Sequence, residues 1–126
     1  MSESHEFEKI CNDIITLSPN MRSATVIDKM GKLIAGGMRQ GVKSMEAAMD
    51  SQKLYVEFAL RSMMREEFDK EFGRTIYSFS VREKVMLASF PLDNHHILRI
   101  SIQKEEVHYY EIIENILQII ANISVR

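Results

Sequence analysis

The histidines of this chain are the residues whose types and spacing come nearest to a metal site. His95 and His96 stand beside Asp93, with His108 further along, and imidazole and carboxylate groups are common metal ligands. Adjacent residues of a strand point to opposite faces of a sheet, so His95 and His96 cannot bind one ion without a bend in the backbone. We therefore predict no metal site and place these histidines at the surface or at a sheet edge.

Cys11 is the only cysteine, so no disulfide can form within the chain, and a reducing compartment suits it. It lies on the apolar stripe of an expected helix, where burial disfavours the thiolate that a nucleophile needs. Cys11 is therefore predicted to be a buried, unreactive packing residue. The sequence also contains no Ser, His and Asp set at a recognisable motif spacing, and we predict that the protein is not an enzyme.

Gly36, Gly37 and Gly41 could belong to a loop that binds phosphate. The sequence lacks the Gly-x-x-x-x-Gly-Lys-Ser/Thr pattern of such loops. Glu46 would also repel an anion from the first turn of the helix expected to follow. We therefore expect no nucleotide and no other cofactor on this chain.

Composition limits the remaining classes of function. The 126 residues suit a single domain over 1–126, and 45% hydrophobic residues suffice for a core without disulfides or metals. A net charge of −2, with the charges interspersed, argues against a nucleic-acid partner. The polar N-terminal segment and the lack of an apolar run of about 20 residues indicate no membrane insertion and a cytoplasmic location.

The elements that must position these residues follow from the hydrophobic periodicity. An amphipathic helix is expected over 7–15, where apolar residues recur at helical spacing. Strands are expected over 22–28 and 33–35, joined by a turn at 29–32 in which Gly31 can adopt a positive φ. Three further strands are expected at 74–80, 85–90 and 96–102, followed by a final helix from Glu105.

The span 44–72 predicts a single long helix, with Ser44 as its N-cap and Gly73 just after its end. Such a rod would reach roughly 43 Å, longer than the sheet of so small a domain. Its apolar residues cover more than one face, so we expect it to need a second partner surface. The predicted dimer interface is one stripe of this helix: Met45, Met49, Gln52, Val56, Ala59 and Met63.

Two features of this span allow two interpretations each. The methionines around the helix suit both a core and an adaptable interface. The charged cluster could be a docking face or a solvated helix end rich in weak ion pairs. That cluster comprises Arg61, Arg65, Glu66, Glu67, Asp69, Lys70 and Glu71.

The connections between the elements predict an α+β fold. Short links between the first two strands and among the last three favour antiparallel pairing. A five-stranded antiparallel sheet, in the order α-β-β-α-β-β-β-α, would bury every apolar stripe if the long helix covered one face and the terminal helices the other. This arrangement is a three-layer sandwich of roadblock/profilin-like architecture.

The segment 21–37, MRSATVIDKMGKLIAGG, resembles the opening hairpin of the Roadblock family, which includes dynein light chains and bacterial partners of small GTPases. A strand ends in Asp, a Gly turn follows, and a second strand runs into small residues. The stretch 74–102 is also similar to small archaeal proteins. The resemblance implies homodimers or heterodimers with a paralogue, joined through central helices and sheet edges. It further implies a platform for a small Ras-like GTPase, which would hold any nucleotide itself, or for a signalling assembly.

Two classes of function remain open from the sequence. The first is a non-catalytic dimeric interaction module, which scaffolds or regulates a small GTPase or a signalling assembly. The second is a small-molecule sensor domain of PAS/profilin-like architecture, with a ligand between the sheet and the long helix. Aromatic residues that could line such a pocket are Tyr55, Tyr77, Phe79 and Phe90.

Overall fold

The computed structural model describes residues 3–124, except for the side chains at 3–4, 48–49 and 124. A five-stranded antiparallel sheet with strand order β2-β1-β5-β4-β3 forms its centre. The strands are β1 (Met21–Asp28), β2 (Leu33–Met38), β3 (Ser78–Val81), β4 (Val85–Pro91) and β5 (His96–Gln103). The helices are α1 (Glu3–Ile15), α2 (Ala48–Glu66), α3 (Asp69–Phe72) and α4 (Tyr109–Ser124).

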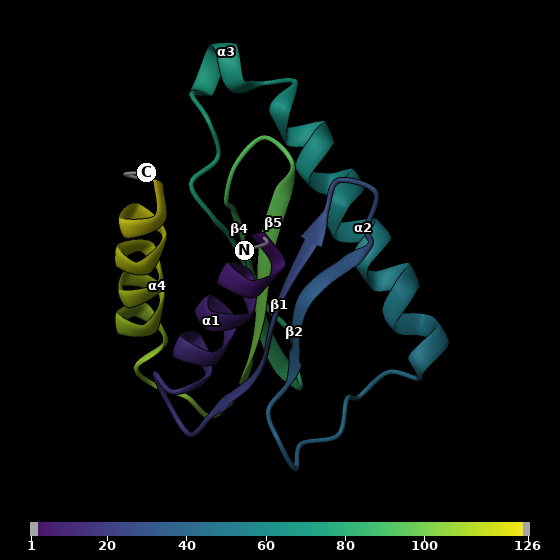
Figure 1. Cartoon of the computed structure of the whole chain (residues 1–126), viewed down its shortest axis with the longest axis vertical. Helices are drawn as coiled ribbons and strands as arrows, with labels where there is room; N and C mark the ends of the chain where they lie inside the picture. The colour runs from purple at the N-terminus through teal and green to yellow at the C-terminus, as the bar shows by residue number, and fades with distance from the viewer. Residues whose placement is uncertain (1–2, 125–126) are drawn as a thin grey trace.

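The three predicted layers are present. Figure 1 shows the sheet between α2 on one side and α1 and α4 on the other, with α3 at the far end of α2. The main core lies under α1 and α4, where Phe7, Ile14 and Ile116 pack against inward-facing residues of the sheet such as Val26 and Leu98. The predicted α+β fold and its element order are therefore confirmed.

The long helix expected over 44–72 is broken and begins later than predicted. Arg22 donates a hydrogen bond to the carbonyl of Lys43, and the hydroxyl of Ser44 bonds the carbonyl of Glu46. These contacts hold the segment in a non-helical path, so α2 starts at Ala48 and Ser44 is not its N-cap. The stop at Gly73 was predicted correctly, because Gly73 follows α3 with φ +80°.

The break after Glu66 removes one reason for expecting a partner. The N–H groups of Glu67 and Phe68 bond carbonyls three residues back, which tightens and ends the helix. The four-residue α3 follows as a separate turn. A single overlong rod therefore does not exist, and any case for an interface must come from side chains that α2 exposes.

Other boundaries also differ from the prediction: α1 begins at Glu3 and not at residue 7, β2 continues to Met38 past the expected end at 35, and two elements begin late. The strand expected over 74–80 is paired only from Ser78, which lies opposite Ser89. Continuing this register toward the N-terminus would place residue 76 opposite Pro91. Proline has no N–H for the ladder. The last helix begins at Tyr109 rather than Glu105, because the carboxylate of Glu106 bonds the N–H of His108 and the loop after α1.

Gly36 brings β2 close to both β1 and α1. Its φ is +85°, and a Cβ atom there would lie 2.1 Å from the carbonyl oxygen of Ala24 and 2.8 Å from Cys11 Sγ. Only glycine fits this position. The thiol of Cys11 is buried as predicted, and burial raises its pKa to about 12, so it stays protonated and unreactive.

Glu106 fastens the start of α4 to the loop between α1 and β1. Its Oε1 accepts hydrogen bonds from Ser18 Oγ at 2.5 Å and Asn20 Nδ2 at 3.1 Å. The bond from Ser18, followed by that from the His108 N–H, lowers the pKa of Glu106 below its ordinary 4.5. A lowered folded-state pKa stabilises the fold at neutral pH, and this stabilisation is lost as the pH falls below about 4.5.

Replacing Glu106 with Gln should therefore cost about 1.5 kcal/mol at pH 7, because the hydrogen bonds that this buried carboxylate accepts become bonds to a neutral amide. The loss should shrink toward pH 3, where the wild-type carboxyl group is itself becoming protonated. Urea unfolding at both pH values measures the difference. Glu105→Gln, one residue away at an exposed position, should change stability little, and equal effects of the two variants would contradict the anchoring role.

Candidate functional site

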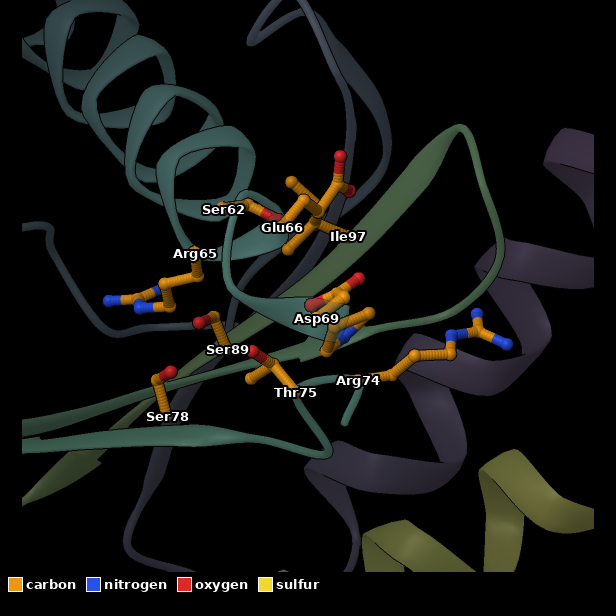
Figure 2. A pocket seen from close by; sticks show the side chains of 10 residues that line it. Ser62, Arg65, Glu66, Asp69, Arg74, Thr75, Ser78, Ser89 and Ile97 are labelled. Carbon is orange, nitrogen blue, oxygen red and sulfur yellow. The ribbon is translucent and has the colours of Figure 1, made fainter. Parts of the chain in front are cut away.

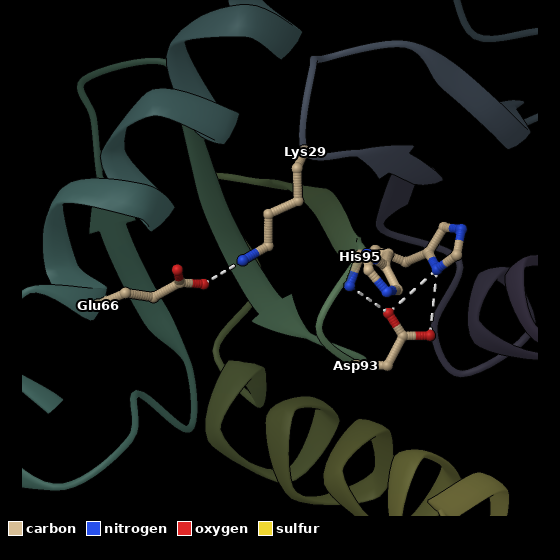
Figure 3. Close-up of polar contacts among 5 residues, drawn as sticks. Lys29, Glu66, Asp93 and His95 are labelled. Atoms are coloured by element: carbon tan, nitrogen blue, oxygen red, sulfur yellow. Dashed lines mark hydrogen bonds and ion pairs between the residues drawn. The ribbon is translucent and has the colours of Figure 1, made fainter.

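The tip of the β1–β2 hairpin anchors α2 to the rest of the protein. A Cβ atom on Gly31 would lie 2.8 Å from the backbone of Val56, so the turn and the helix are in direct contact. Gln52 Nε2 donates to the carbonyl of Gly31 at 3.3 Å. Lys29 forms an ion pair with Glu66 near the end of α2, as Figure 3 shows. The hairpin thereby sets the position of the helix along the sheet.

The side of α2 that faces the sheet forms a second, small core. Ala59 is 2% exposed and packs with Ile27 and Ile97, and Tyr55 and Phe58 cover the cluster. The apolar contacts are few because most residues on this face of the sheet are polar. The helix is therefore held by one short cluster and by the hairpin tip.

The six predicted interface residues do not act as one stripe. Ala59 is internal, and Gln52 and Val56 contact the hairpin of their own chain. Met45 precedes α2 and is 56% exposed, and Met63 on α2 is 48% exposed. The side chain of Met49 lies outside the described residues. Ala59 is buried against its own sheet and is not available to a partner, whereas Gln52 and Val56 contact the hairpin but remain exposed. Their place in an interface stays a prediction.

Other large apolar side chains of α2 point away from the sheet. Leu60 is 54% exposed and Met64 is 64% exposed. Together with Met63 they form what we call the α2 ridge: Leu60, Met63 and Met64. Beyond the helix, Phe68 and Phe72 are exposed and stack on each other with ring centroids 6.0 Å apart. Contiguous exposed apolar side chains of this kind mark interaction surfaces.

An open groove of about 1270 Å³ runs between the other side of α2 and the sheet. We call it the α2 groove. The helix contributes Leu54, Tyr55 and Phe58, and the floor is formed by alternate residues of the strands. Their hydroxyl groups replace the apolar side chains that usually lie beneath a helix. The hydroxyl residues of the floor are Ser23, Thr25, Ser78, Ser80, Ser89 and Ser101.

Arg99 lies in the middle of this floor. It is 4% exposed, and its guanidinium carbon lies 5.2 Å from the ring centre of Tyr55 and 4.9 Å from that of Phe58. Its Nη1 is 3.5 Å from Thr25 Oγ1. Burial lowers the pKa of Arg99, while Tyr55 and Glu46 act in the opposite direction. Arg99 was not among the residues predicted from the sequence, although a charged residue between Leu98 and Ile100 in an apolar strand was a visible signal.

The charged cluster near the end of α2 is partly used within the chain. Arg65, Glu66 and Asp69 surround a cavity of about 30 Å³ next to Arg74 and Thr75. Figure 2 shows these side chains gathering from α2, α3 and the segment before β3. The cavity has room for about one water molecule. It is too small for a ligand, and its residues serve to join α2 and α3 to the edge of the sheet.

Of the histidines considered as metal ligands, His95 and His96 contact Asp93. His96 Nδ1 is 3.0 Å from both carboxylate oxygens of Asp93, which also accepts the N–H of His95, as drawn in Figure 3. Burial raises the pKa of Asp93, but the bonds from His95 and His96 outweigh it, and the pKa lies below its ordinary value. Across residues 3–124, the structure shows no group of three His, Cys, Asp or Glu side chains suited to a metal ion.

The aromatic residues proposed for a sensor pocket do not surround one space. Tyr77 and Phe90 stack on each other against the main core. Phe79 borders the α2 groove but stacks on Tyr109 of α4, and only Tyr55 stands within the groove beside Arg99. The predicted lining is therefore wrong for Tyr77 and Phe90 only. Their neighbours Ser78 and Ser89 line the groove, and adjacent residues of an extended strand face opposite layers. Within the described part of the chain, no helix is both long and apolar enough to cross a bilayer.

Solved structures share this arrangement of elements. The gliding protein MglB from Thermus thermophilus matches with a TM-score of 0.75 at 13% identity, covering 98% of this chain and 92% of its own. MglB from Myxococcus xanthus matches with a TM-score of 0.70 at 15% identity, covering 97% of each chain. A Roadblock/LC7 domain from Streptomyces avermitilis matches with a TM-score of 0.66 at 7% identity, covering 94% of this chain and 98% of its own.

These likenesses establish the Roadblock/LC7 fold that the sequence predicted. No curated protein matches the chain in sequence. The model of a family of unknown function (DUF6659) matches residues 2–122, and the chain belongs to that family.

Proposed function

We propose that the protein is a non-catalytic interaction module that pairs with a second copy, or with a paralogue, through the α2 ridge. The carrying observation is the exposure of Leu60, Met63 and Met64 on a helix that its own sheet holds by only a small cluster. Burying these side chains against a partner would remove apolar surface from water and stabilise the otherwise weakly held helix. Met45 and Met63 remain part of the proposed interface.

The fold supports this proposal. An MglB structure described as a tetrameric arrangement matches this chain with a TM-score of 0.75 over 98% of its length. The Roadblock resemblance implies pairing through central helices, and α2 is the central helix here. The edge strand β3, Ser78–Val81, pairs on one side only, with β4. A second copy could extend the sheet from this edge.

The α2 ridge can be tested with Leu60→Glu. Because Leu60 is 54% exposed, the variant should keep its fold but place a charge in the dimer interface. We expect the dimer to dissociate at least about tenfold more readily, the effect of roughly 1.4 kcal/mol. Sedimentation equilibrium over a range of concentrations measures the change.

Gln118→Glu is the matched control for this experiment. It also adds one negative charge at an exposed helical position, but on α4, which covers the opposite face of the sheet, and it should leave self-association unchanged. A wild-type protein that is monomeric at high concentration would contradict the proposed homodimer. A Leu60→Glu variant with the wild-type dimer constant would show that the interface lies elsewhere.

The proposed role of the dimer is to scaffold or regulate a small Ras-like GTPase. This role is an expectation from the Roadblock resemblance. Purified Ras-like GTPases from the source organism, loaded with GDP or with a non-hydrolysable GTP analogue, can be titrated against the protein by calorimetry. Binding that depends on the loaded nucleotide, or a changed rate of GTP hydrolysis, would support regulation. Equal binding in both states would favour a scaffold, and no binding to any of them would contradict a GTPase partner.

The α2 groove favours a second candidate function, a small-molecule sensor. The groove is large, has a polar floor and lies between the sheet and the central helix, where a ligand was envisaged from the sequence. The two functions are compatible, because the groove and the α2 ridge lie on different sides of the helix.

A further inference from the structure

Arg99 is a buried cation for which its own chain supplies no matching anion. Within the part of the chain that the structure describes, no carboxylate lies at ion-pair distance from it, and its Nε atom has no hydrogen-bond partner. Burying an unpaired charge costs several kcal/mol unless an opposite charge or hydrogen-bond acceptors compensate. The poorly compensated positive charge of Arg99 therefore indicates that an anionic partner is missing.

The neighbours of Arg99 compensate its charge only in part. The contact with Thr25 Oγ1 is long at 3.5 Å. The rings of Tyr55 and Phe58 attract the guanidinium through their faces, and the Tyr55 hydroxyl group adds a polar contact, but both effects are weaker than an ion pair. Glu46 contributes at longer range, and its Oε2 accepts a hydrogen bond from Ser51 at 2.9 Å. Space for a further oxyanion is available because Arg99 borders the open α2 groove.

The rest of the α2 groove also favours a negatively charged ligand. Its described lining holds six basic side chains and three acidic ones, and one of the acids, Glu57, is paired with Arg61 at 3.2 Å. Ser89 of β4 and Thr25 of β1 lie opposite Arg99 in the two neighbouring strands, and Ser101 follows two residues later in β5. Hydroxyl donors and an excess of arginines are the groups that bind carboxylates and phosphates.

We propose that the α2 groove binds a small organic anion, whose carboxylate or phosphate group lies against Arg99. A free small molecule suits this position better than the apolar face of a partner helix. Ser23 and Ser101 bond each other, but such a helix would strip water from the hydroxyl groups of Ser78, Ser80 and Ser89 on the same floor. At about 1270 Å³ the groove exceeds a typical ligand pocket of about 300–1,000 Å³, so the ligand fills only part of it.

The test uses the full-length protein with inorganic phosphate and with succinate as probes. Thermal unfolding is followed in each salt and in potassium chloride of equal ionic strength. At least one probe should raise the midpoint beyond the chloride control, since a ligand that binds only the native state stabilises it. Arg99→Met should weaken binding, measured by calorimetry, by about 10- to 100-fold, the loss expected for a hydrogen bond to a charged group.

Lys9→Met is the matched control, because it removes one positive charge from an exposed residue of α1. It should retain the full response. In chloride alone, Arg99→Met should unfold at the same temperature as the wild type or higher, because it removes a poorly compensated buried charge. If Arg99→Met fails to fold, the side-chain Nε–H resonance of Arg99 in the wild type decides the question, and it should shift as phosphate or succinate is added.

Three results would overturn the proposal. The first is that neither probe raises the midpoint beyond chloride, and the second is that Arg99→Met responds as the wild type does. The third is that Arg99→Met weakens self-association with no response to either anion, which would assign the counter-charge to a carboxylate of a second copy. The proposed dimer is tested separately, because Leu60→Glu should become monomeric and still respond to the anion.

Discussion

Gly36→Ala, which adds one methyl group, is expected to lower the stability of the fold strongly. The added Cβ would lie 2.1 Å from the carbonyl oxygen of Ala24, a backbone atom that can move only if the β1–β2 pairing opens. It would also press on Cys11 Sγ in the main core and hold a non-glycine residue at φ +85°. The backbone strain and the overpacking each cost about 1–3 kcal/mol. We expect a total loss of about 3 kcal/mol or more.

Urea unfolding followed by circular dichroism, at one fixed protein concentration, measures this loss. The neighbouring residue provides the control. A Cβ atom on Gly37 would meet no atom within 4 Å, and the φ of Gly37 is not positive. Gly37→Ala should therefore leave stability unchanged or raise it by about 0.5 kcal/mol. Equal losses in the two variants would mean that β2 does not approach α1 as closely as described.

Ala59→Glu is expected to release α2 from the sheet or to unfold the protein. Ala59 is 2% exposed between Ile27 and Ile97, and the residues packed around it in this cluster are apolar or aromatic. An unpaired carboxylate buried there should cost about 3 kcal/mol or more. Helix propensity is not the cause, since alanine and glutamate both favour helices. Loss of helical circular dichroism and a lower urea midpoint would show the effect.

Leu60→Glu separates burial from the mere presence of a glutamate in α2. The two positions are adjacent, but Leu60 is 54% exposed, so its variant should stay folded and lose only self-association. If Ala59→Glu remained as stable as Leu60→Glu, the face of α2 assigned to the sheet would be wrong. The pair therefore tests the orientation of the helix, on which both the α2 ridge and the α2 groove depend.

The strands could be predicted closely because their signals are local. Alternation and β-branched residues marked β1 and β5, and the turn needed only Gly31 and the hydrogen bonds that Asp28 accepts from Met30 and Lys32. The limits of α2 were less predictable. Nothing between Ser44 and Phe72 disfavours a helix locally, and its late start depends on the bond from Arg22 of a distant strand to the carbonyl of Lys43.

The amino-acid order was sufficient to predict an α+β domain with the Roadblock/LC7 arrangement, because periodicity and turn residues act over a few positions. It could not decide which side of α2 faces the sheet. Periodicity shows which residues share a face, but Ala59 becomes internal only when Ile27 and Ile97 meet it in space. The role proposed for Arg99 likewise depends on the tertiary structure. An arginine in a strand is unremarkable until folding places it under two aromatic rings, without a carboxylate and beside an open groove.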